Sequence, residues 1–192
     1  MVKIDYEIQN CVASGSVETS RIDLYALADQ LGEKPEYFVS YEPEKFPGLV
    51  LKIPKPKVSS LIFASGKMVI TGAKSAEQLH VAAEEIVKVL KNAGARITGK
   101  PQVTVQNIVA SGNINAIINL ELASIMLEGS MYEPEQFPGL IYRIREPKTV
   151  LLLFQSGAFV CTGAKKEEFV SESTRKTYEI LQEVGALEEE FI

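Results

Sequence analysis

Apolar and polar positions alternate along several short stretches of the chain, which is typical of β-strands that bury one face. This alternation predicts strands over residues 7–13, 49–53, 58–64 and 67–71, and again over 104–110, 140–144, 149–155 and 158–162. Two longer segments instead repeat their apolar residues every three or four positions, as one face of a helix does. The pattern therefore predicts an α+β protein built mainly from an antiparallel sheet.

The two longer segments carry helix boundary signals. The first is expected to start at Ser75, with Gln78 completing a capping box, and to end at Gly94. The second is expected to end at Gly185, and shorter helices are expected after the N-caps Asp23 and Asn119. The predicted inner faces of the long helices are Leu79, Ala82, Ala83, Ile86 and Leu90, and then Phe169, Thr177, Ile180, Leu181 and Val184.

The chain contains the same block twice. Eight of the nine residues 41–49 return at 132–140, and over 41–74 against 132–165 there are 20 identities in 34 pairs at an offset of 91. Residues 9–15 match 106–112 at an offset of 97, so the length difference lies largely in a loop around Gly32 to Ser40. Two copies are too few for a solenoid and favour a fused pseudo-dimer. We expect two repeats, 1–98 and 99–192, that share about ten strands and four helices.

Strand parity sorts the side chains of the predicted sheet into two sets. Helices that follow the strands of one antiparallel sheet are expected to cover one face, and the set that suits this core includes Cys11, Ile62, Ile70, Leu153 and Cys161. The opposite set is apolar or uncharged, whereas a solvated sheet face is normally polar, so it indicates a binding surface. A sheet buried on both faces, for instance by a partner subunit, is the alternative.

Charge is unevenly distributed along the chain. The formal net charge of −5 argues against a nucleic-acid partner at face value. However, residues 41–74 hold six lysines and two glutamates, whereas residues 166–192 hold three basic residues and eight glutamates. A basic rim around an apolar, hydrogen-bonding face would suit a DNA minor groove, although both charged segments could also be plain solvated faces.

Other classes of protein find little support. There is no Gly-rich phosphate motif and no Ser-His-Asp set, and the single histidine, His80, is expected on a helix surface. Two cysteines 150 positions apart, with one histidine, form neither a disulfide framework nor a zinc site. Apolar runs are too short for a membrane span, and the start of the chain lacks a signal-peptide core, so we expect a cytosolic protein without a cofactor.

The duplicated blocks resemble the core of the TATA-box-binding proteins of archaea and eukaryotes, from about Ile8 to Gly185. The shared motifs are two copies each of Gln-Asn-x-Val, Tyr-Glu-Pro-Glu-x-Phe-Pro-Gly-Leu and Thr-Gly-Ala-Lys. The resemblance implies a pseudo-two-fold saddle, a curved antiparallel sheet with four helices on its convex face. It also implies a general transcription initiation factor, cytoplasmic on chromosomal DNA if archaeal and nuclear if eukaryotic.

The same resemblance assigns roles to individual residues. It implies sharp bending of the TATA box from the minor groove, with Phe46, Phe63, Phe137 and Phe154 as wedges at two base steps. It places on base edges Asn10, Asn107, Thr71, Thr162, Val12, Val69, Val109, Val160, Leu61 and Leu152. It places on phosphates Lys52, Lys57, Lys67, Arg143 and Lys148.

The resemblance further implies protein partners. The loop of Glu133, Pro134, Glu135 and Gln136 would dock transcription factor B, which recruits RNA polymerase, and the first loop differs from it by Lys45. Two departures from symmetry are Ala158, where the first repeat has Lys67, and Lys166, where it has Ser75. A nonspecific architectural DNA binder and a small-ligand module are the competing functions, and self-association of the free protein stays open.

Overall fold

The computed structural model describes residues 4–188, so Glu189 and Glu190 of the acidic end lie outside the described residues. The chain divides into two compact units, one of residues 10–106 and the other of residues up to Gln9 together with those from Asn107 onward. We call them the middle unit and the terminal unit, and describe each by itself. Within the described part of the chain, no helix is long and apolar enough to cross a membrane.

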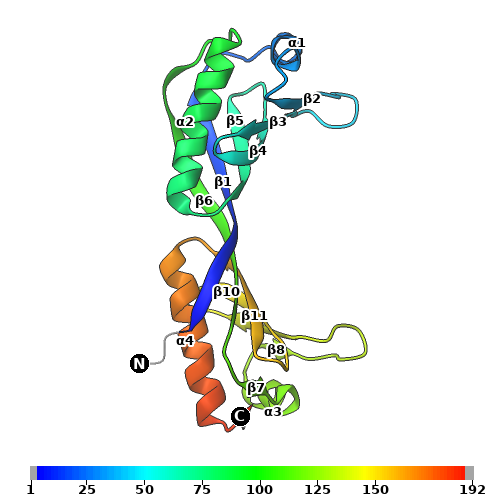
Figure 1. The fold of residues 1–192 in the computed structure, drawn as a ribbon, viewed down its shortest axis with the longest axis vertical. Helices are drawn as coiled ribbons and strands as arrows, with labels where there is room; N and C mark the ends of the chain where they lie inside the picture. The colour runs from blue at the N-terminus through cyan, green and yellow to red at the C-terminus, as the bar shows by residue number, and fades with distance from the viewer. Residues whose placement is uncertain (1–3, 189–192) are drawn as a thin grey trace. The chain divides into compact units, whose positions relative to one another are not determined.

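The middle unit is a five-stranded antiparallel arrangement with two helices (Figure 1). Its strands follow the order β2-β3-β4-β5-β1, and α2 lies against β5 while α1 lies against β2. The bounds are β1 Asp5–Glu18, α1 Leu24–Gly32, β2 Phe38–Ser40, β3 Leu49–Pro54, β4 Lys57–Ile62, β5 Lys67–Ala73 and α2 Ala76–Asn92.

The terminal unit repeats this plan with the strand order β6-β11-β10-β9-β8. Helix α4 lies against β10 and β11, and α3 lies against β8. The bounds are β6 Thr98–Asn113, α3 Leu120–Met126, β8 Ser130–Met131, β9 Leu140–Ile144, β10 Thr149–Leu153, β11 Ala158–Ala164 and α4 Glu167–Glu183. Two further short strands, β7 Ile117–Ile118 and β12 Leu187–Glu188, pair with each other.

The ten-stranded antiparallel sheet with four helices confirms the predicted fold class. The boundaries between the two units lie at Gln9/Asn10 and Gln106/Asn107. Strands β1 and β6 therefore contribute residues to both units. The sequence repeats 1–98 and 99–192 stay a prediction. Both β1 and β6 extend several residues beyond the predicted segments 7–13 and 104–110.

Strand parity correctly predicted the buried face. Cys11, Ile62, Ile70, Leu153 and Cys161 are all fully buried. Burial raises the pKa of the Cys161 thiol to about 12, because a low-dielectric core disfavours the thiolate. All five residues predicted for the inner face of α2 are buried as well.

The inner face of α4 is more polar than the sequence pattern predicted. The predicted Phe169, Ile180 and Val184 are only partly buried. The buried positions are instead Val170, Ser173 and Thr174, together with the predicted Thr177 and Leu181. The Oγ atoms of Ser173 and Thr149 lie 2.7 Å apart in a hydrogen bond. Small hydroxyl residues can therefore occupy this core, because their polar atoms have partners.

The helix boundaries agree closely with the sequence signals. Ser75 is the N-cap of α2, and its Oγ accepts from the Gln78 N–H at 3.0 Å, while Gln78 Oε1 accepts from the Lys74 N–H at 2.8 Å. Gly94 follows the C-cap with φ of 99°, the left-handed conformation that glycine tolerates. Asp23 and Asn119 cap α1 and α3, whereas Lys166 makes no side-chain cap for α4.

Candidate nucleic-acid interface

One face of the middle unit carries the predicted binding set. Register places Lys52, Ser59, Thr71 and Val12 side by side across β3, β4, β5 and β1. Cross-strand partners share a face, so these four side chains form one row. A second row on the same face is Val50, Leu61, Val69 and Ser14.

The terminal unit presents equivalent rows. Arg143, Val150 and Thr162 are cross-strand partners, and a second row consists of Ile141, Leu152, Val160 and Ser111. Except for the exposed Arg143, these side chains are partly exposed, whereas the alternate positions of the same strands are almost all buried. Each unit therefore has an open face of the predicted composition.

A pair of phenylalanines lies at the end of each open face. The ring centroids of Phe46 and Phe63 lie 5.8 Å apart at 67°, and those of Phe137 and Phe154 lie 5.9 Å apart at 65°. Phe46 and Phe137 are 41% and 36% exposed, so a large apolar edge faces solvent in each pair. Edge-to-face packing holds each exposed ring against its less exposed partner.

A glycine supports each pair at close range. A Cβ atom on Gly48 would lie 2.7 Å from Phe46 Cε1, and one on Gly139 would lie 2.8 Å from Phe137 Cε1. Any larger residue would have to displace the ring. The repeated Phe-Pro-Gly motif is therefore explained by the position of the exposed phenylalanine.

Asn10 is anchored by a β-bulge. The register of β1 against β5 shifts between Cys11 and Val12, and Gly72 on β5 has φ of 100°. The Gly72 N–H donates to Asn10 Oδ1 at 2.8 Å, and Asn10 Nδ2 lies 3.2 Å from Thr71 Oγ1. Because Oδ1 is held by a backbone donor, the amide orientation is set and Nδ2 keeps a second hydrogen for a ligand.

Asn107 repeats this arrangement in the terminal unit. The register of β11 against β6 shifts between Cys161 and Ala164, and Gly163 has φ of 86°. The Gly163 N–H donates to Asn107 Oδ1 at 2.7 Å, and Asn107 Nδ2 lies 3.4 Å from Thr162 Oγ1. Sequence reasoning missed both bulges, although the repeated Thr-Gly-Ala-Lys motif was their signal.

The predicted phosphate-binding cations lie at the borders of the open faces. All five are exposed, and none forms an ion pair with a residue in the described part of the chain; they are Lys52, Lys57, Lys67, Arg143 and Lys148. Lys52 Nζ lies 4.8 Å above the ring of Phe38, its cross-strand partner on β2. Phe38 belongs to the longer first-repeat loop and was not foreseen as part of this border.

The two loops before the exposed phenylalanines differ in charge pairing. Lys45 forms an ion pair with Glu42 in the first loop. In the second loop Gln136 replaces the lysine, and both Glu133 and Glu135 are exposed. The backbone of each loop turns in the same way, since the N–H groups of Phe46 and Phe137 donate to the carbonyl oxygens of Glu42 and Glu133. The second loop therefore presents the more negative surface.

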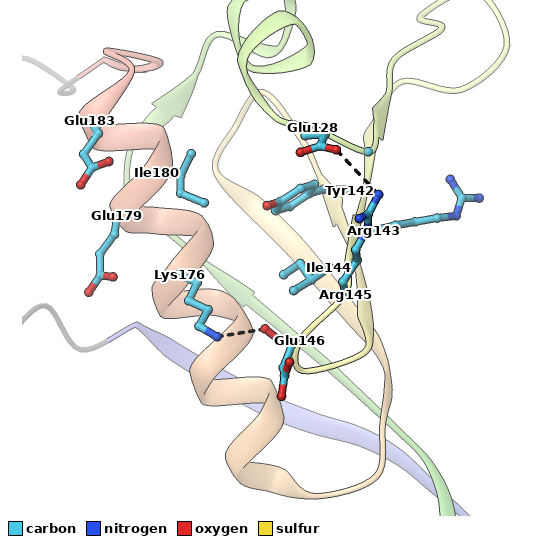
Figure 2. Close-up of a pocket in the computed structure, with 11 residues that line it drawn as sticks. Glu128, Tyr142, Arg143, Ile144, Arg145, Glu146, Lys176, Glu179, Ile180 and Glu183 are labelled. Atoms are coloured by element: carbon cyan, nitrogen blue, oxygen red, sulfur yellow. Dashed lines mark hydrogen bonds and ion pairs between the residues drawn. The ribbon is translucent and has the colours of Figure 1, made fainter.

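A separate hollow of about 380 Å³ lies between α4 and β9 in the terminal unit (Figure 2). Both Arg145 and Lys176 have acidic partners, since Arg145 Nη2 lies 3.7 Å from Glu128 Oε1 and Lys176 Nζ lies 2.7 Å from Glu172 Oε1. Burial and the nearby Glu128 raise the pKa of Tyr142, which lines it. Tyr142 pairs with the buried Leu151, so this hollow is not on the open face.

An antiparallel sheet with an apolar, amide-bearing face and an exposed basic border is typical of a sheet-based nucleic-acid-binding protein. The sequence model described as "Transcription factor TFIID (or TATA-binding protein, TBP)" matches residues 5–93 and 102–184. The chain belongs to this TATA-binding family.

Individual relatives agree with this assignment. The TATA-box-binding protein of Sulfurisphaera tokodaii is 49% identical over 94% of this chain and 88% of that protein. The TATA-box-binding protein of Pyrodictium occultum is 52% identical over 94% of this chain and 87% of that protein. A solved structure described as Methanococcus jannaschii TBP matches with a TM-score of 0.82 and 41% identity, covering 93% of this chain and 99% of that one. The chain is thus a DNA-binding transcription factor of the TATA-box type.

Proposed function

We propose that the chain binds the TATA box from the minor groove, bends it sharply, and then nucleates assembly of transcription factor B and RNA polymerase. The observation that carries this proposal is the duplicated pair of phenylalanines beside a duplicated, bulge-anchored asparagine. Each feature occurs at equivalent positions of both units, as a DNA site read by two similar halves requires.

The exposed phenylalanines supply the bend. An apolar ring inserted between two base pairs unstacks that step and kinks the duplex away from the protein, a rule to which this family itself contributed. Unstacking costs roughly a few kcal/mol per step, and the bent groove offsets this cost by exposing more surface to the protein. Phe46 with Phe63, and Phe137 with Phe154, would act at two separate steps.

The asparagines and the apolar rows supply the preference for A·T pairs. In the minor groove, adenine N3 and thymine O2 are acceptors, and the free Nδ2 hydrogens of Asn10 and Asn107 are matching donors. The guanine amino group would collide with Val12, Val69, Val109 and Val160 on the groove floor. Thr71 and Thr162 lie beside the asparagines, and Leu61 and Leu152 lie near the kinked steps.

The second loop supplies the protein contact. Glu133 and Glu135 are exposed beside Pro134 and Gln136, without the lysine that neutralises Glu42 in the first loop. A negative loop attracts a basic partner and orients its approach. We infer that transcription factor B docks here, so the charge difference between the loops would select one side of the complex.

Binding and bending are tested on a short TATA duplex labelled at both ends for energy transfer, beside a GC-substituted duplex. The proposal expects tight, salt-sensitive binding and shorter end-to-end distance on the TATA duplex alone. Phe137→Ala with Phe154→Ala should remove the shortening, whereas Phe169→Ala, a partly exposed position on α4, should leave it intact. Circular dichroism melts would verify that each variant is folded.

Equal binding to both duplexes would favour a nonspecific architectural protein. Absence of binding to either duplex would contradict the proposal and favour a small-ligand module or a face buried by self-association.

Partner docking needs a separate test. Glu133→Lys with Glu135→Lys should abolish the ternary complex with transcription factor B while leaving binary DNA binding intact. The matched control is Glu42→Lys with Glu44→Lys in the first loop, which should leave the ternary complex in place. Unchanged ternary affinity in the first variant would rule out this docking loop.

A further inference from the structure

A hollow of about 540 Å³ lies on the open face of the terminal unit, beside the wedge Phe154. Its lining includes Asp5, Glu7, Ser111, Phe154, Ala158 and Val160. Two carboxylates therefore lie at a surface that is proposed to meet a polyanion. Neither forms an ion pair with any residue between 4 and 188.

Strand geometry confirms which way these carboxylates face. Gln9 Nε2 donates to Ser111 Oγ at 3.0 Å, and Ser111 is the cross-strand partner of Val160 on the open face. Within the part of β1 that belongs to the terminal unit, which ends at Gln9, alternation then places Glu7 and Asp5 on the same side as Gln9. Tyr6 has the opposite orientation, since burial and the nearby Glu167, at the start of α4, raise the pKa of its hydroxyl.

The middle unit has neutral residues at the equivalent place. The offset of 97 that relates the two Gln-Asn motifs makes Gln102 and Thr104 the counterparts of Asp5 and Glu7. Gln106 Nε2 donates to Ser14 Oγ at 2.8 Å, which repeats the contact of Gln9 with Ser111. The two sites therefore have equivalent surroundings, but only the terminal unit has carboxylates at these two positions.

A third position increases the difference in charge between the two units. Ala158 occupies the place of Lys67, at the offset of 91. The site beside Phe63 thus has a net charge of +1 (Lys67, Gln102, Thr104), and the site beside Phe154 has −2 (Ala158, Asp5, Glu7), a difference of three charges.

The other border cations of the two faces match in charge. Lys52 corresponds to Arg143 and Lys57 to Lys148, so these pairs are equal in sign. Glu18, whose counterpart is Asn115, reduces the difference by one, and its carboxylate accepts from the Thr98 hydroxyl at 3.4 Å. Even with Glu18 included, the middle unit is more positive by two charges.

We propose that Asp5, Glu7 and Ala158 are specificity-determining residues that make the terminal unit the weaker phosphate-binding half and so bias the orientation of the protein on an asymmetric TATA box. The proposal rests on the proposed DNA-binding function. Where phosphate attraction is weaker, less energy is available to offset unstacking. The terminal unit should therefore select the half with flexible TA steps, leaving a stiff A-tract to the middle unit.

Orientation can be read by directed cleavage. An iron chelate attached through Glu44→Cys, an exposed position in the first loop, marks the DNA half that meets the middle unit. The native Cys11 and Cys161 are fully buried, so the label should attach at position 44 only. The duplex carries a TATA-type half and an A-tract half, and cleavage at the two ends is compared.

The labelled protein, otherwise unchanged, should cut the A-tract end about five-fold more than the other end, the size expected for a few screened surface charges. A triple variant of the labelled protein combines Asp5→Gln, Glu7→Thr and Ala158→Lys. Its cleavage ratio between the two DNA ends should fall to about one. The salt slope of its affinity should steepen by about 0.9 for the added lysine. Raising salt from about 50 to 200 mM should shrink the original bias, as screening requires. The matched control, Glu168→Gln with Glu183→Gln on α4, removes the same number of exposed carboxylates and should retain the bias.

Tight binding with an equal ratio in the labelled protein and the triple variant would overturn the proposal. Loss of the bias in the α4 control would also overturn it, because total charge would then be the cause. A labelled protein that neither binds nor bends the duplex would instead contradict the proposed function itself, so the two failures are distinguishable.

Discussion

At the scale of single residues, the candidate interface depends on an asparagine held by a glycine N–H. Asn107 Oδ1 accepts from the Gly163 N–H at 2.7 Å, which leaves the amide nitrogen to face a ligand. The side-chain amide of Asn107 therefore has two roles. Its oxygen stabilises the fold, and its nitrogen is available to recognise a ligand. Substitutions at this position can separate the two roles.

We predict that Asn107→Asp will retain most of the folding stability but lose DNA affinity. The carboxylate keeps an acceptor for the Gly163 N–H, whereas the donor is lost and a negative charge faces the groove. Asn107→Ala should lose both, lowering the free energy of unfolding by about 1 kcal/mol. Urea melts and TATA-duplex titrations would measure the two effects, and an Asn107→Asp variant with full affinity would contradict the assigned role.

A second residue-scale prediction concerns the seat of the exposed wedge. A Cβ atom on Gly139 would lie 2.8 Å from Phe137 Cε1 and 3.0 Å from Phe154 Cε1, so Gly139→Ala should displace both rings. We expect reduced bending in the energy-transfer assay with a loss of stability of about 1–3 kcal/mol. Gly32→Ala is the control, because nothing lies within 4 Å of its Cβ position. Normal bending by Gly139→Ala would show that the wedge tolerates the shift.

At the scale of elements, helix caps and strand parity were predictable because each depends on local chemistry. Ser75, Asp23 and Asn119 cap helices through their own side chains, and a period of two sorts a strand whatever its neighbours are. The lengths of β1 and β6 were underestimated, since their outer residues pair with distant segments. The hydroxyl-rich core of α4 was missed because Ser173 needs Thr149 as a partner, which only the tertiary structure provides.

The candidate site shows a similar division. The open faces followed from parity and from the repeat, whereas individual DNA contacts came from the resemblance to a family. Spacing alone did not reveal the bulges at Gly72 and Gly163, because a bulge depends on the register of a neighbouring strand. The contact of Phe38 with Lys52 was likewise invisible, since it depends on how β2 pairs with β3.

The ends of the two long helices allow an element-scale prediction. Ser75 caps α2, but Lys166 at the equivalent place makes no cap and puts a positive charge at the start of α4. Lys166→Ser should stabilise the protein by about 1 kcal/mol, reduced slightly by loss of the contact between Lys166 and Phe169 at 5.7 Å. For a chain of this length the melting temperature should rise by about 2–4 °C. Ser75→Ala is the reciprocal variant and should lower it by a similar amount.

At the scale of the whole molecule, the net charge argues against DNA binding, whereas the local charge of the open faces favours it. The chain has a formal net charge of −5, yet it exposes five cations at the borders of its open faces. Counterion release depends on the phosphates that are neutralised locally, and the distant acidic residues contribute little across more than a Debye length. An acidic protein can therefore bind DNA in a strongly salt-dependent way.

With roughly five phosphate contacts, the logarithm of affinity for a TATA duplex should fall with the logarithm of salt at a slope near −4.5. Raising salt from about 50 to 200 mM should then weaken binding by about 500-fold. Lys57→Ala should reduce the magnitude of the slope by about 0.9, whereas Lys88→Ala, an exposed position on α2 that pairs with Glu85 at 3.4 Å, should leave it unchanged. Fluorescence anisotropy over a salt series measures these slopes, and equal slopes for the two variants would show that the border cations do not bind phosphates.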